Sequence, residues 1–332
     1  MTVVKENGMD NGEKSTVSLL LVIGLLIMAI AGCVTYSTRT IGVTPEDGAL
    51  AVRAGDRVLL RYRYEGVPYK PYVQELFTPA GVNILRDAPA DHLHHHALMF
   101  AVGLDGVNFW EEQNQPGKQQ HRSFAHSVQV GSRDTPHIVR FDEQLDWVNP
   151  RTNGVLAEEM RTIEVRETKG ENVTLVTWKA ELSPPAGKDS VMLTGSHYFG
   201  LGVRFVESMD QGGEFQNADG KPGVVFRGDE RLVRSNWCAY SAKANGKVVT
   251  VAMFGHPDNP RHPTTWFTMT KPFAYLSATL ALHEEPLKVT AAEPLMLRYG
   301  VALWDGQVQT EQIDKLYVRW VDWIGKTGDQ LR

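Results

Sequence analysis

The sequence predicts an all-β fold, an antiparallel sandwich or barrel, with a single helix near its C-terminal end. Three observations carry this prediction: short β-rich segments recur along the chain, turn-forming dipeptides separate them, and only one segment has clear helical periodicity. The strand segments are 57–64, 96–102, 137–141, 161–166, 173–178, 248–254, 273–282 and 295–303. The turn signals are Asp105-Gly106, Lys169-Gly170, Asp219-Gly220, Asn245-Gly246 and Asp305-Gly306.

The expected helix covers about residues 311–324. Its apolar residues fall at three- and four-residue spacing and are Ile313, Leu316, Tyr317, Trp320 and Ile324. This spacing places them on one face, which such a helix buries against the body of the fold. We find no convincing internal repeat and no linker after residue 48, so residues 49–326 are expected to form one domain.

Residues 1–32 are expected to be a secretion signal and not part of the fold. Residues 17–32 form an apolar run that is shorter than the roughly 20 residues needed to span a membrane. The run ends in Ile30-Ala31-Gly32-Cys33, which resembles the lipobox of bacterial lipoproteins. That resemblance implies cleavage before Cys33 and lipidation of its thiol; an uncleaved N-terminal anchor is the alternative. Residues 33–48 would then form a tether between the lipid and the domain.

Charge and cysteine content limit the partners. The net charge is −5 and Lys and Arg do not cluster, so we expect no nucleic-acid binding. Once Cys33 carries lipid, Cys238 is the only free thiol, which excludes an internal disulfide and nearly excludes a cysteine-ligated zinc site. The lipid is therefore the expected membrane contact. Because Val34 gives no aspartate retention signal, a host with two membranes would sort the protein to the outer membrane, facing the periplasm.

Four of the eleven histidines lie within five positions: His92, His94, His95 and His96. Histidine suits proton transfer near neutral pH or metal binding, and these residues are candidate catalytic groups, a solvated polar loop being the alternative. On an extended backbone His92, His94 and His96 would share one face, with Asp91 and His95 on the other. Alternate side chains of a strand lie about 6.6–6.8 Å apart, too far to converge easily on one ion. We therefore expect an activity without metal or other cofactor.

Two further segments carry candidate residues. Trp110 and Glu112 are expected to present an aromatic surface and a carboxylate to a substrate. His197 and Arg204 are polar interruptions in the glycine-spaced apolar strand of residues 195–205, where glycines permit the close approach of a ligand or another backbone. We expect His197 to be catalytic and Arg204 to bind substrate; a core histidine is the alternative for His197.

The loop at residues 255–266 is the third candidate. Its prolines stiffen the chain, so polar side chains would be held in place before a substrate binds. His256, Asn259, Arg261 and Trp266 are expected to contact substrate, and an ordinary rigid turn is the alternative.

At these places the sequence resembles a bacterial domain family of unknown function, often labelled "methane oxygenase PmoA". The matching stretches are Lys70-Pro71-Tyr72 through the histidine cluster to Phe109-Trp110, then Gly200-Leu201-Gly202-Val203-Arg204-Phe205, then His256-Pro257 with Asn259-Pro260-Arg261, within a likeness over roughly residues 50–320. The family's first motif is approximately D-H-P-H-H-R-G. Asp91, His92, His94 and His95 match it, whereas Leu93, His96 and Ala97 differ.

The resemblance implies a β-sandwich and gene neighbourhoods rich in sugar-processing proteins. A weaker likeness of residues 195–201 to the catalytic-histidine strand of aldose mutarotases implies a large antiparallel supersandwich. A genuine methane monooxygenase subunit would need several apolar spans, and the sequence beyond residue 32 has none, so that activity is not expected.

Together these observations predict an envelope lipoprotein that acts on carbohydrate as a lyase, hydrolase or epimerase, with the three motifs in one cleft. His95 and His197 are the expected proton-transfer pair, and Arg204 or Arg261 would hold a carboxylate or a developing oxyanion. Two alternatives remain: a non-catalytic surface glycan-binding lipoprotein, and a metal-dependent enzyme whose histidines and Asp91 hold a divalent ion.

Overall fold

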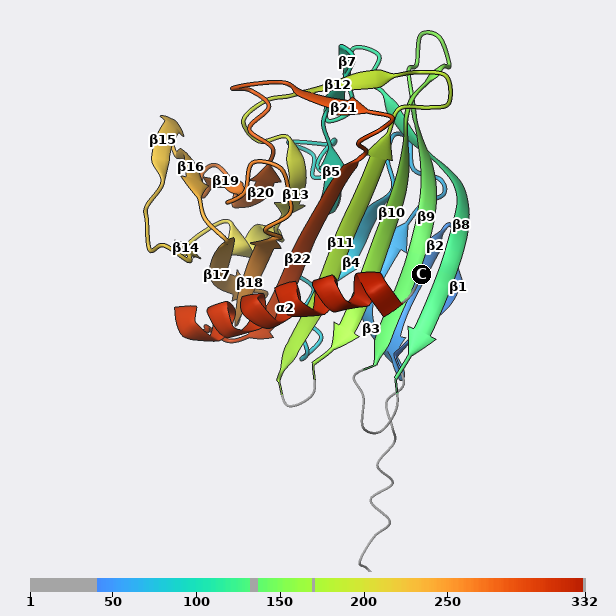
Figure 1. Ribbon diagram of the computed structural model, residues 1–332. Coiled ribbons are helices and arrows are strands. Elements are labelled where there is room, and N and C mark those ends of the chain that lie inside the picture. The colour runs from blue at the N-terminus through green and yellow to red at the C-terminus, as the bar shows by residue number, and fades with distance from the viewer. Residues whose placement is uncertain (1–40, 132–136, 169–170, 331–332) are drawn as a thin grey trace, which may run out of the picture. The chain divides into compact units, whose positions relative to one another are not determined.

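The computed structural model describes residues 41–131, 137–168 and 171–330, so the predicted signal and Cys33, the predicted site of lipidation, lie outside the described residues (Figure 1). The first described strand, β1 (Ile41–Glu46), pairs with β2 (Ala49–Ala54). Residues 41–48, which were expected to belong to the tether, therefore form a hairpin of the folded domain. Its turn is Asp47-Gly48, and an Asp-Gly pair favours such two-residue hairpin loops.

Two large antiparallel sheets and one small sheet make up the described part of the chain. In spatial order, the ten-stranded sheet contains β1, β2, β3 (Arg57–Arg63), β4 (Tyr72–Leu76), β5 (Leu98–Ala101), β13 (Gly200–Arg204), β20 (Tyr275–Thr279), β19 (Thr265–Met269), β16 (Glu230–Arg234) and β15 (Val224–Arg227). The eight-stranded sheet contains β14 (Glu214–Asn217), β17 (Trp237–Ala244), β18 (Lys247–Gly255), β22 (Leu295–Asp305), β11 (Val173–Ser183), β10 (Val155–Glu167), β9 (Ile138–Val148) and β8 (Lys118–Val130).

The small sheet contains β21 (Leu287–Thr290), β12 (Ser190–Thr194), β6 (Gly103–Leu104) and β7 (Val107–Asn108), and a 3-10 turn, η2 (Glu207–Met209), follows β13. The predicted all-β class is confirmed, and each of the predicted strand segments overlaps an observed strand. Asp105-Gly106 and Asn245-Gly246 form the turns of two hairpins, with both residues of each pair at positive φ, as such turns require.

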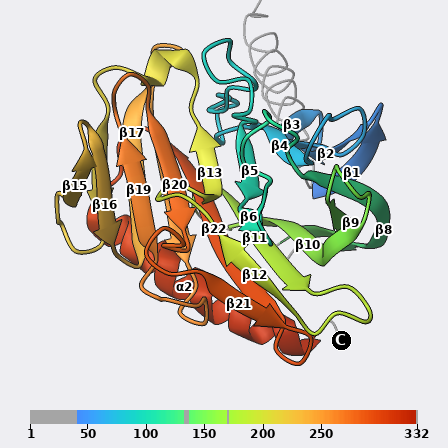
Figure 2. The ribbon, with the colours of Figure 1, turned by 90° about the horizontal axis from the view of Figure 1, so that it is seen from above.

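The main core lies between the two large sheets, which pack face to face as a β-sandwich. Phe100 on β5 contacts Trp147 on β9, with ring centroids 5.9 Å apart. Phe205, just after β13, contacts Tyr240 on β17 at 5.0 Å. Figure 2 shows the molecule from above, with β16, β19, β20, β13 and β5 of the ten-stranded sheet following one another across the view.

The predicted C-terminal helix is confirmed as α2 (Thr310–Gln330), which crosses the strands of the eight-stranded sheet (Figure 1). The five apolar residues of the predicted face are all buried, in a second cluster formed with residues of β11, β17, β18 and β22. The helix therefore covers the face of this sheet that points away from the sandwich core. Within the described residues, no helix is both long enough and apolar enough to cross a membrane.

The strands that carry the candidate site belong to the ten-stranded sheet. On β13, Leu201 and Val203 are buried in the core between the sheets, so by alternation Gly202 and Arg204 point to the opposite, outer face. Arg204 pairs in register with Tyr275 on β20, which therefore shares that outer face. Loops that precede β5 and β13 fold over the same face and complete a hollow there.

Candidate functional site

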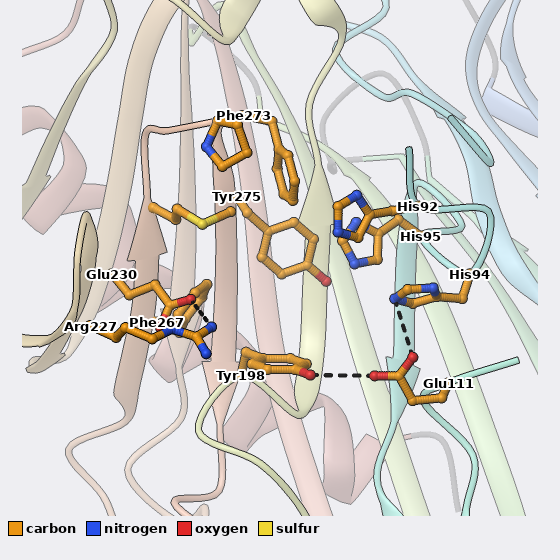
Figure 3. Close-up of a pocket in the computed structure, with 12 residues that line it drawn as sticks. His92, His94, His95, Glu111, Tyr198, Arg227, Glu230, Phe267, Phe273 and Tyr275 are labelled. Atoms are coloured by element: carbon orange, nitrogen blue, oxygen red, sulfur yellow. Dashed lines mark hydrogen bonds and ion pairs between the residues drawn. The ribbon is translucent and has the colours of Figure 1, made fainter. Parts of the chain in front are cut away.

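A cavity of about 420 Å³ lies on the outer face of the ten-stranded sheet (Figure 3). We call it the histidine pocket. Its walls are formed by His92, His94, His95, Glu111, Tyr198, Arg227, Glu230, Phe267, Met269, Pro272, Phe273 and Tyr275. The pocket thus combines imidazoles, two carboxylates and two phenols with the rings of two phenylalanines, and its volume is within the range of about 300–1,000 Å³ typical of small-molecule sites.

The histidine cluster forms two successive turns and not the extended backbone that we expected. The amide of His92 donates to the carbonyl of Pro89 at 2.9 Å, and the amide of His95 donates to the carbonyl of His92 at 2.9 Å. A third hydrogen bond, from the amide of Ala88 to the carbonyl of His95 at 3.0 Å, links the two ends of this segment. Because a turn does not alternate its side chains as a strand does, His92 and His95 lie on the same side, with stacked rings 4.7 Å apart.

His95 is the most enclosed of the three pocket histidines. Its side chain packs against Tyr275, with ring centroids 5.0 Å apart, and its Nδ1 has no hydrogen-bond partner among the described residues. Burial, followed by the neighbouring His94 and His92, lowers the pKa of His95 to about 2. The imidazole is therefore neutral at physiological pH, where it can accept a hydrogen bond but cannot supply a proton.

His94 faces a carboxylate. Its Nε2 lies 3.7 Å from Glu111 Oε2, while the other oxygen of Glu111 accepts a hydrogen bond from the Tyr198 hydroxyl at 3.4 Å. Burial lowers the pKa of His94, and burial together with Glu111 raises the pKa of Tyr198. Figure 3 shows these three side chains facing one another along one wall of the pocket.

His96 points away from the pocket and forms a buried ionic chain. Its Nδ1 lies 2.9 Å from Asp87 Oδ1 and its Nε2 lies 2.9 Å from Glu112 Oε1, and the same Glu112 oxygen accepts from Lys70 Nζ at 2.7 Å. Burial alone would lower the pKa of His96, but the hydrogen bonds to the two carboxylates outweigh it and raise the pKa. Glu112 thus contacts Lys70 and His96 and does not line the pocket, where Glu111 lies instead; that Glu112 binds substrate stays a prediction.

His197 stands behind the opposite wall. Its Nε2 lies 3.0 Å from Glu230 Oε2, and its ring stacks on Phe226 with centroids 3.8 Å apart. Arg227 donates to the other oxygen of Glu230 at 2.6 Å, so this carboxylate has a partner on each oxygen. Burial lowers the pKa of His197. His197 thus reaches the pocket through Glu230 and not through its own ring.

Arg204 lies behind the histidines, not in the lining of the pocket. Its side chain is 1% exposed; Nη2 donates to Asp91 Oδ2 at 3.1 Å, and the guanidinium carbon lies 3.5 Å from the centre of the Phe273 ring. Nε and Nη1 have no hydrogen-bond partner among the described residues, and burial lowers the pKa of Arg204. The guanidinium therefore supports the pocket wall through Asp91 and Phe273.

The glycine-spaced strand works as predicted, with protein atoms as the close neighbours. A Cβ at Gly200 would collide with the carbonyl of Ala278 on the adjacent strand, and a Cβ at Gly202 would collide with the hydroxyl of Tyr275. That hydroxyl is buried and has no hydrogen-bond partner in the described part of the chain. Gly202 thus allows Tyr275 to lie flat against β13 within the pocket.

The third motif does not join the pocket. Asn259 forms two 2.8 Å hydrogen bonds with the backbone of Arg298, and His256 packs on Trp320 of α2, with ring centroids 5.7 Å apart. Arg261 donates to the carbonyls of Leu280, Ala281 and Pro286 and lines a different cavity. The prediction that this loop lines a common cleft is wrong, because its polar groups are used to fix the loop to neighbouring backbone.

The two candidate tryptophans are core residues. Trp266 is fully buried, and its Nε1 donates to the carbonyl of Ser235 at 2.8 Å. Trp110 is fully buried and stacks on Phe199 at 5.2 Å, behind the pocket. The expectation that they offer open aromatic faces to a substrate is wrong.

Sequence reasoning missed several residues of the pocket: Glu111, Tyr198, Arg227, Glu230, Phe267, Phe273 and Tyr275. Glu111 lies between the candidate residues Trp110 and Glu112, and Tyr198 follows the candidate His197, so the motifs indicated the correct segments. Glu230 and Arg227 come from the edge hairpin β15–β16, and no sequence pattern connects them to the histidines. Among the residues that the structure describes, no group of three or more His, Cys, Asp or Glu is arranged to hold a metal ion.

Comparison of the sequence with family models places residues 49–318 in a family of unknown function, DUF6807, and the chain belongs to that family. The division of the chain into domains, the "methane oxygenase PmoA" label and the lipoprotein signal stay predictions. No curated protein matches the chain.

Among solved structures, the fold is similar to the GH36 α-galactosidases AgaB and AgaA of Geobacillus stearothermophilus, with TM-scores of 0.45 and 0.44 and identities of 10% and 9%. Each match covers 80% of this chain and 41% of the galactosidase, so the chain spans about two fifths of those enzymes. Slr1438 of Synechocystis sp. PCC 6803 matches with a TM-score of 0.31 and 9% identity, over 81% of this chain and 98% of that protein.

Proposed function

We propose that the protein is a carbohydrate-acting enzyme of the lyase, hydrolase or epimerase type, with the histidine pocket as its active site. The observation that carries the proposal is the pairing of Glu111 with Tyr198 and His94 at the wall of a cavity that also has aromatic faces. A carboxylate, a phenol and an imidazole in mutual reach are the groups that acid–base catalysis uses.

The lining suits a sugar in two ways. A sugar ring has apolar faces and a polar edge, and Phe267, Phe273 and Tyr275 supply aromatic surfaces for the former. The Tyr275 hydroxyl and His95 Nδ1 are buried polar atoms without partners among the described residues, and a buried polar group without a partner costs about 1–3 kcal/mol. Sugar hydroxyls both donate and accept hydrogen bonds, so a bound sugar would satisfy both atoms.

The residues divide the proton transfer as follows. Glu111 removes a proton from a sugar carbon or hydroxyl, and the Tyr198 hydroxyl beside it supplies a proton to the leaving or ring oxygen. His95, whose pKa is lowered to about 2 by burial, acts as a neutral hydrogen-bond acceptor. Glu230, held by His197 and Arg227, provides a second, fixed carboxylate on the opposite wall.

Cys33 is proposed to carry the lipid that holds this enzyme at the cell envelope, as the lipobox-like sequence before it suggests. The resemblance of the motifs to the PmoA-labelled family, with its sugar-processing gene neighbourhoods, supports carbohydrate as the substrate class. Methane oxidation is not part of the proposal.

The test is turnover of neutral and uronate-containing oligosaccharides by the full chain in detergent, followed by chromatography, mass spectrometry and NMR. Hydrolysis adds one water to the products, a lyase leaves an unsaturated sugar, and an epimerase changes the NMR spectrum at constant mass. Glu111→Gln is expected to lower kcat by about 10²–10⁴-fold, while Glu293→Gln, at an exposed turn, serves as the matched control. Unchanged turnover by Glu111→Gln contradicts the assignment, and binding without any turnover identifies a non-catalytic glycan-binding protein.

A further inference from the structure

A second hollow, of about 470 Å³, adjoins the histidine pocket. It is bounded by the β6–β7 turn, the segment after β7 and the β9–β10 loop. Besides the carboxylates of Asp105 and Glu111, its polar side chains are Asn108, Gln113, Asn114, Gln115, Asn149 and Arg151, and we call it the amide pocket. Glu111 lines both this hollow and the histidine pocket, so a single carboxylate stands at their junction.

The two pockets differ in chemistry. The histidine pocket has aromatic and imidazole rings, whereas none of the described residues that line the amide pocket is aromatic. Side-chain amides carry a donor and an acceptor on one planar group, and a guanidinium carries several donors. Such groups match the hydroxyls of a sugar, each of which both donates and accepts.

Part of the amide pocket is held in place by the protein itself. Arg151 Nε donates to Gln115 Oε1 at 2.8 Å, and the Arg151 amide donates to Asn149 Oδ1 at 2.9 Å. Asn108 Oδ1 accepts from the amide of Glu111 at 3.1 Å, which fixes the backbone at the junction. Gln113 and Asn114 are exposed on the rim. A pre-ordered wall with open amides at its edge favours binding, because less side-chain entropy is lost.

We infer that the substrate is an oligosaccharide of at least two units, with one unit in the histidine pocket, the next in the amide pocket, and the bond between them beside Glu111. This inference rests on the proposed function and specifies its substrate class. A monosaccharide would leave the amide pocket unused. Glu111, the candidate acid–base group, lies at the rim of the histidine pocket, where its side chain is 33% exposed. A bond between sugar units in the two pockets would lie at this rim and not at the base of the histidine pocket.

The experiment measures dissociation constants of the full chain in detergent by calorimetry. The probes are glucose, cellobiose and cellotetraose, and the corresponding monosaccharide, disaccharide and tetrasaccharide series of galactose and xylose. In the series that binds, each oligosaccharide is expected to bind at least about tenfold more tightly than its monosaccharide, since a single hydrogen bond to a charged group contributes enough for that factor.

Arg151→Ala is expected to remove about tenfold of the affinity for the tetrasaccharide and to leave monosaccharide affinity unchanged. Gln113→Ala, at an exposed position, should act in the same direction without affecting the fold. Arg122→Ala is the matched control, since Arg122 is 52% exposed on β8 and pairs with Asp146, outside both pockets.

Equal affinity for the monosaccharide and its oligosaccharides, with Arg151→Ala silent, overturns the inference and leaves the proposed function standing. A loss of monosaccharide affinity in Arg151→Ala equal to the loss for the tetrasaccharide also overturns it, because the two pockets would then not be separate subsites. If none of the sugars binds, the inference fails, and the proposed function is then decided by the turnover of the uronate-containing oligosaccharides.

Discussion

Replacement of His96 by alanine should destabilise the protein far more than replacement of His94, although the two histidines are two residues apart. His96 makes two 2.9 Å contacts with the partly buried carboxylates of Asp87 and Glu112, and its own side chain is 8% exposed. Each hydrogen bond to a charged group contributes about 1.5–3 kcal/mol, and breaking a buried ion pair costs about 3–5 kcal/mol. Asp87 keeps its bonds to Tyr72 and Gln74, so we expect His96→Ala to cost about 3–5 kcal/mol and no more.

His94 provides the matched control. In the described part of the chain, the carboxylate oxygen nearest to His94 is that of Glu111 at 3.7 Å, beyond hydrogen-bonding distance, and such loosely placed pairs contribute about 0–1 kcal/mol. The assay is urea unfolding of the full chain in detergent, followed by tryptophan fluorescence. A cost below about 1 kcal/mol for His96→Ala would refute the view that the ionic chain holds the histidine turns.

The loss of unfolding free energy in His96→Ala should depend on pH in a defined direction. The pKa of His96 is raised above its ordinary value of 6.5 in the folded protein. The stability that its protonated ring contributes is therefore fully present below about pH 6.5 and is lost as the pH rises through the folded-state pKa. The difference in unfolding free energy between the native protein and His96→Ala should be larger at low pH than at high pH; a difference that grows as the pH increases would contradict this.

Three further outcomes are expected. Trp266→Ala should lower the free energy of unfolding in urea by about 3–5 kcal/mol, because a fully buried ring is removed. Asn259→Ala should lower it by about 1–3 kcal/mol. Both variants should bind sugar with unchanged affinity; a loss of affinity at normal stability would show that the loop contacts the sugar. Gly202→Ala should displace Tyr275 and weaken sugar binding, with about 1–3 kcal/mol of destabilisation from overpacking; unchanged affinity would show that the Tyr275 hydroxyl does not contact the ligand. Cys33→Ala should leave an unprocessed precursor without palmitate label in cells, and equal labelling of both forms would exclude lipidation at that residue.

Fold class could be predicted from the sequence because its determinants are local. Alternation along strands, Asp-Gly and Asn-Gly turns and the apolar face of α2 are each set within a few residues, and all are found in the structure. The assignment of residues 41–48 to the tether overlooked Asp47-Gly48, a turn signal of the same kind. The order of the strands in the sheets depends on pairings between distant segments, and no short pattern in the sequence reports it.

The site could be predicted only in part, since residue type does not distinguish a group that binds a ligand from one that binds its own protein. His92, His94 and His95 line the pocket, while His96 and Glu112 belong to a buried ionic chain. The difference arises from two turns that break the alternation of the backbone. In the same way, the polar residues of the loop at 255–266 are those expected of a binding loop, but their partners are carbonyls and amides of neighbouring segments.

Gly202 shows how the fold and the site depend on one another. The glycine was predicted to allow a ligand or a second backbone to approach, and the group that approaches is the hydroxyl of Tyr275. The Tyr275 ring lies 5.0 Å from that of His95, so the strand, the tyrosine and the histidine turn are packed as one unit. Because neither the hydroxyl nor His95 Nδ1 has a partner in the described part of the chain, this packing leaves two buried polar atoms unsatisfied. A protein accepts that cost most readily where a ligand supplies the missing hydrogen bonds, which is why the base of the histidine pocket, and not the loop at 255–266, is where we place the sugar.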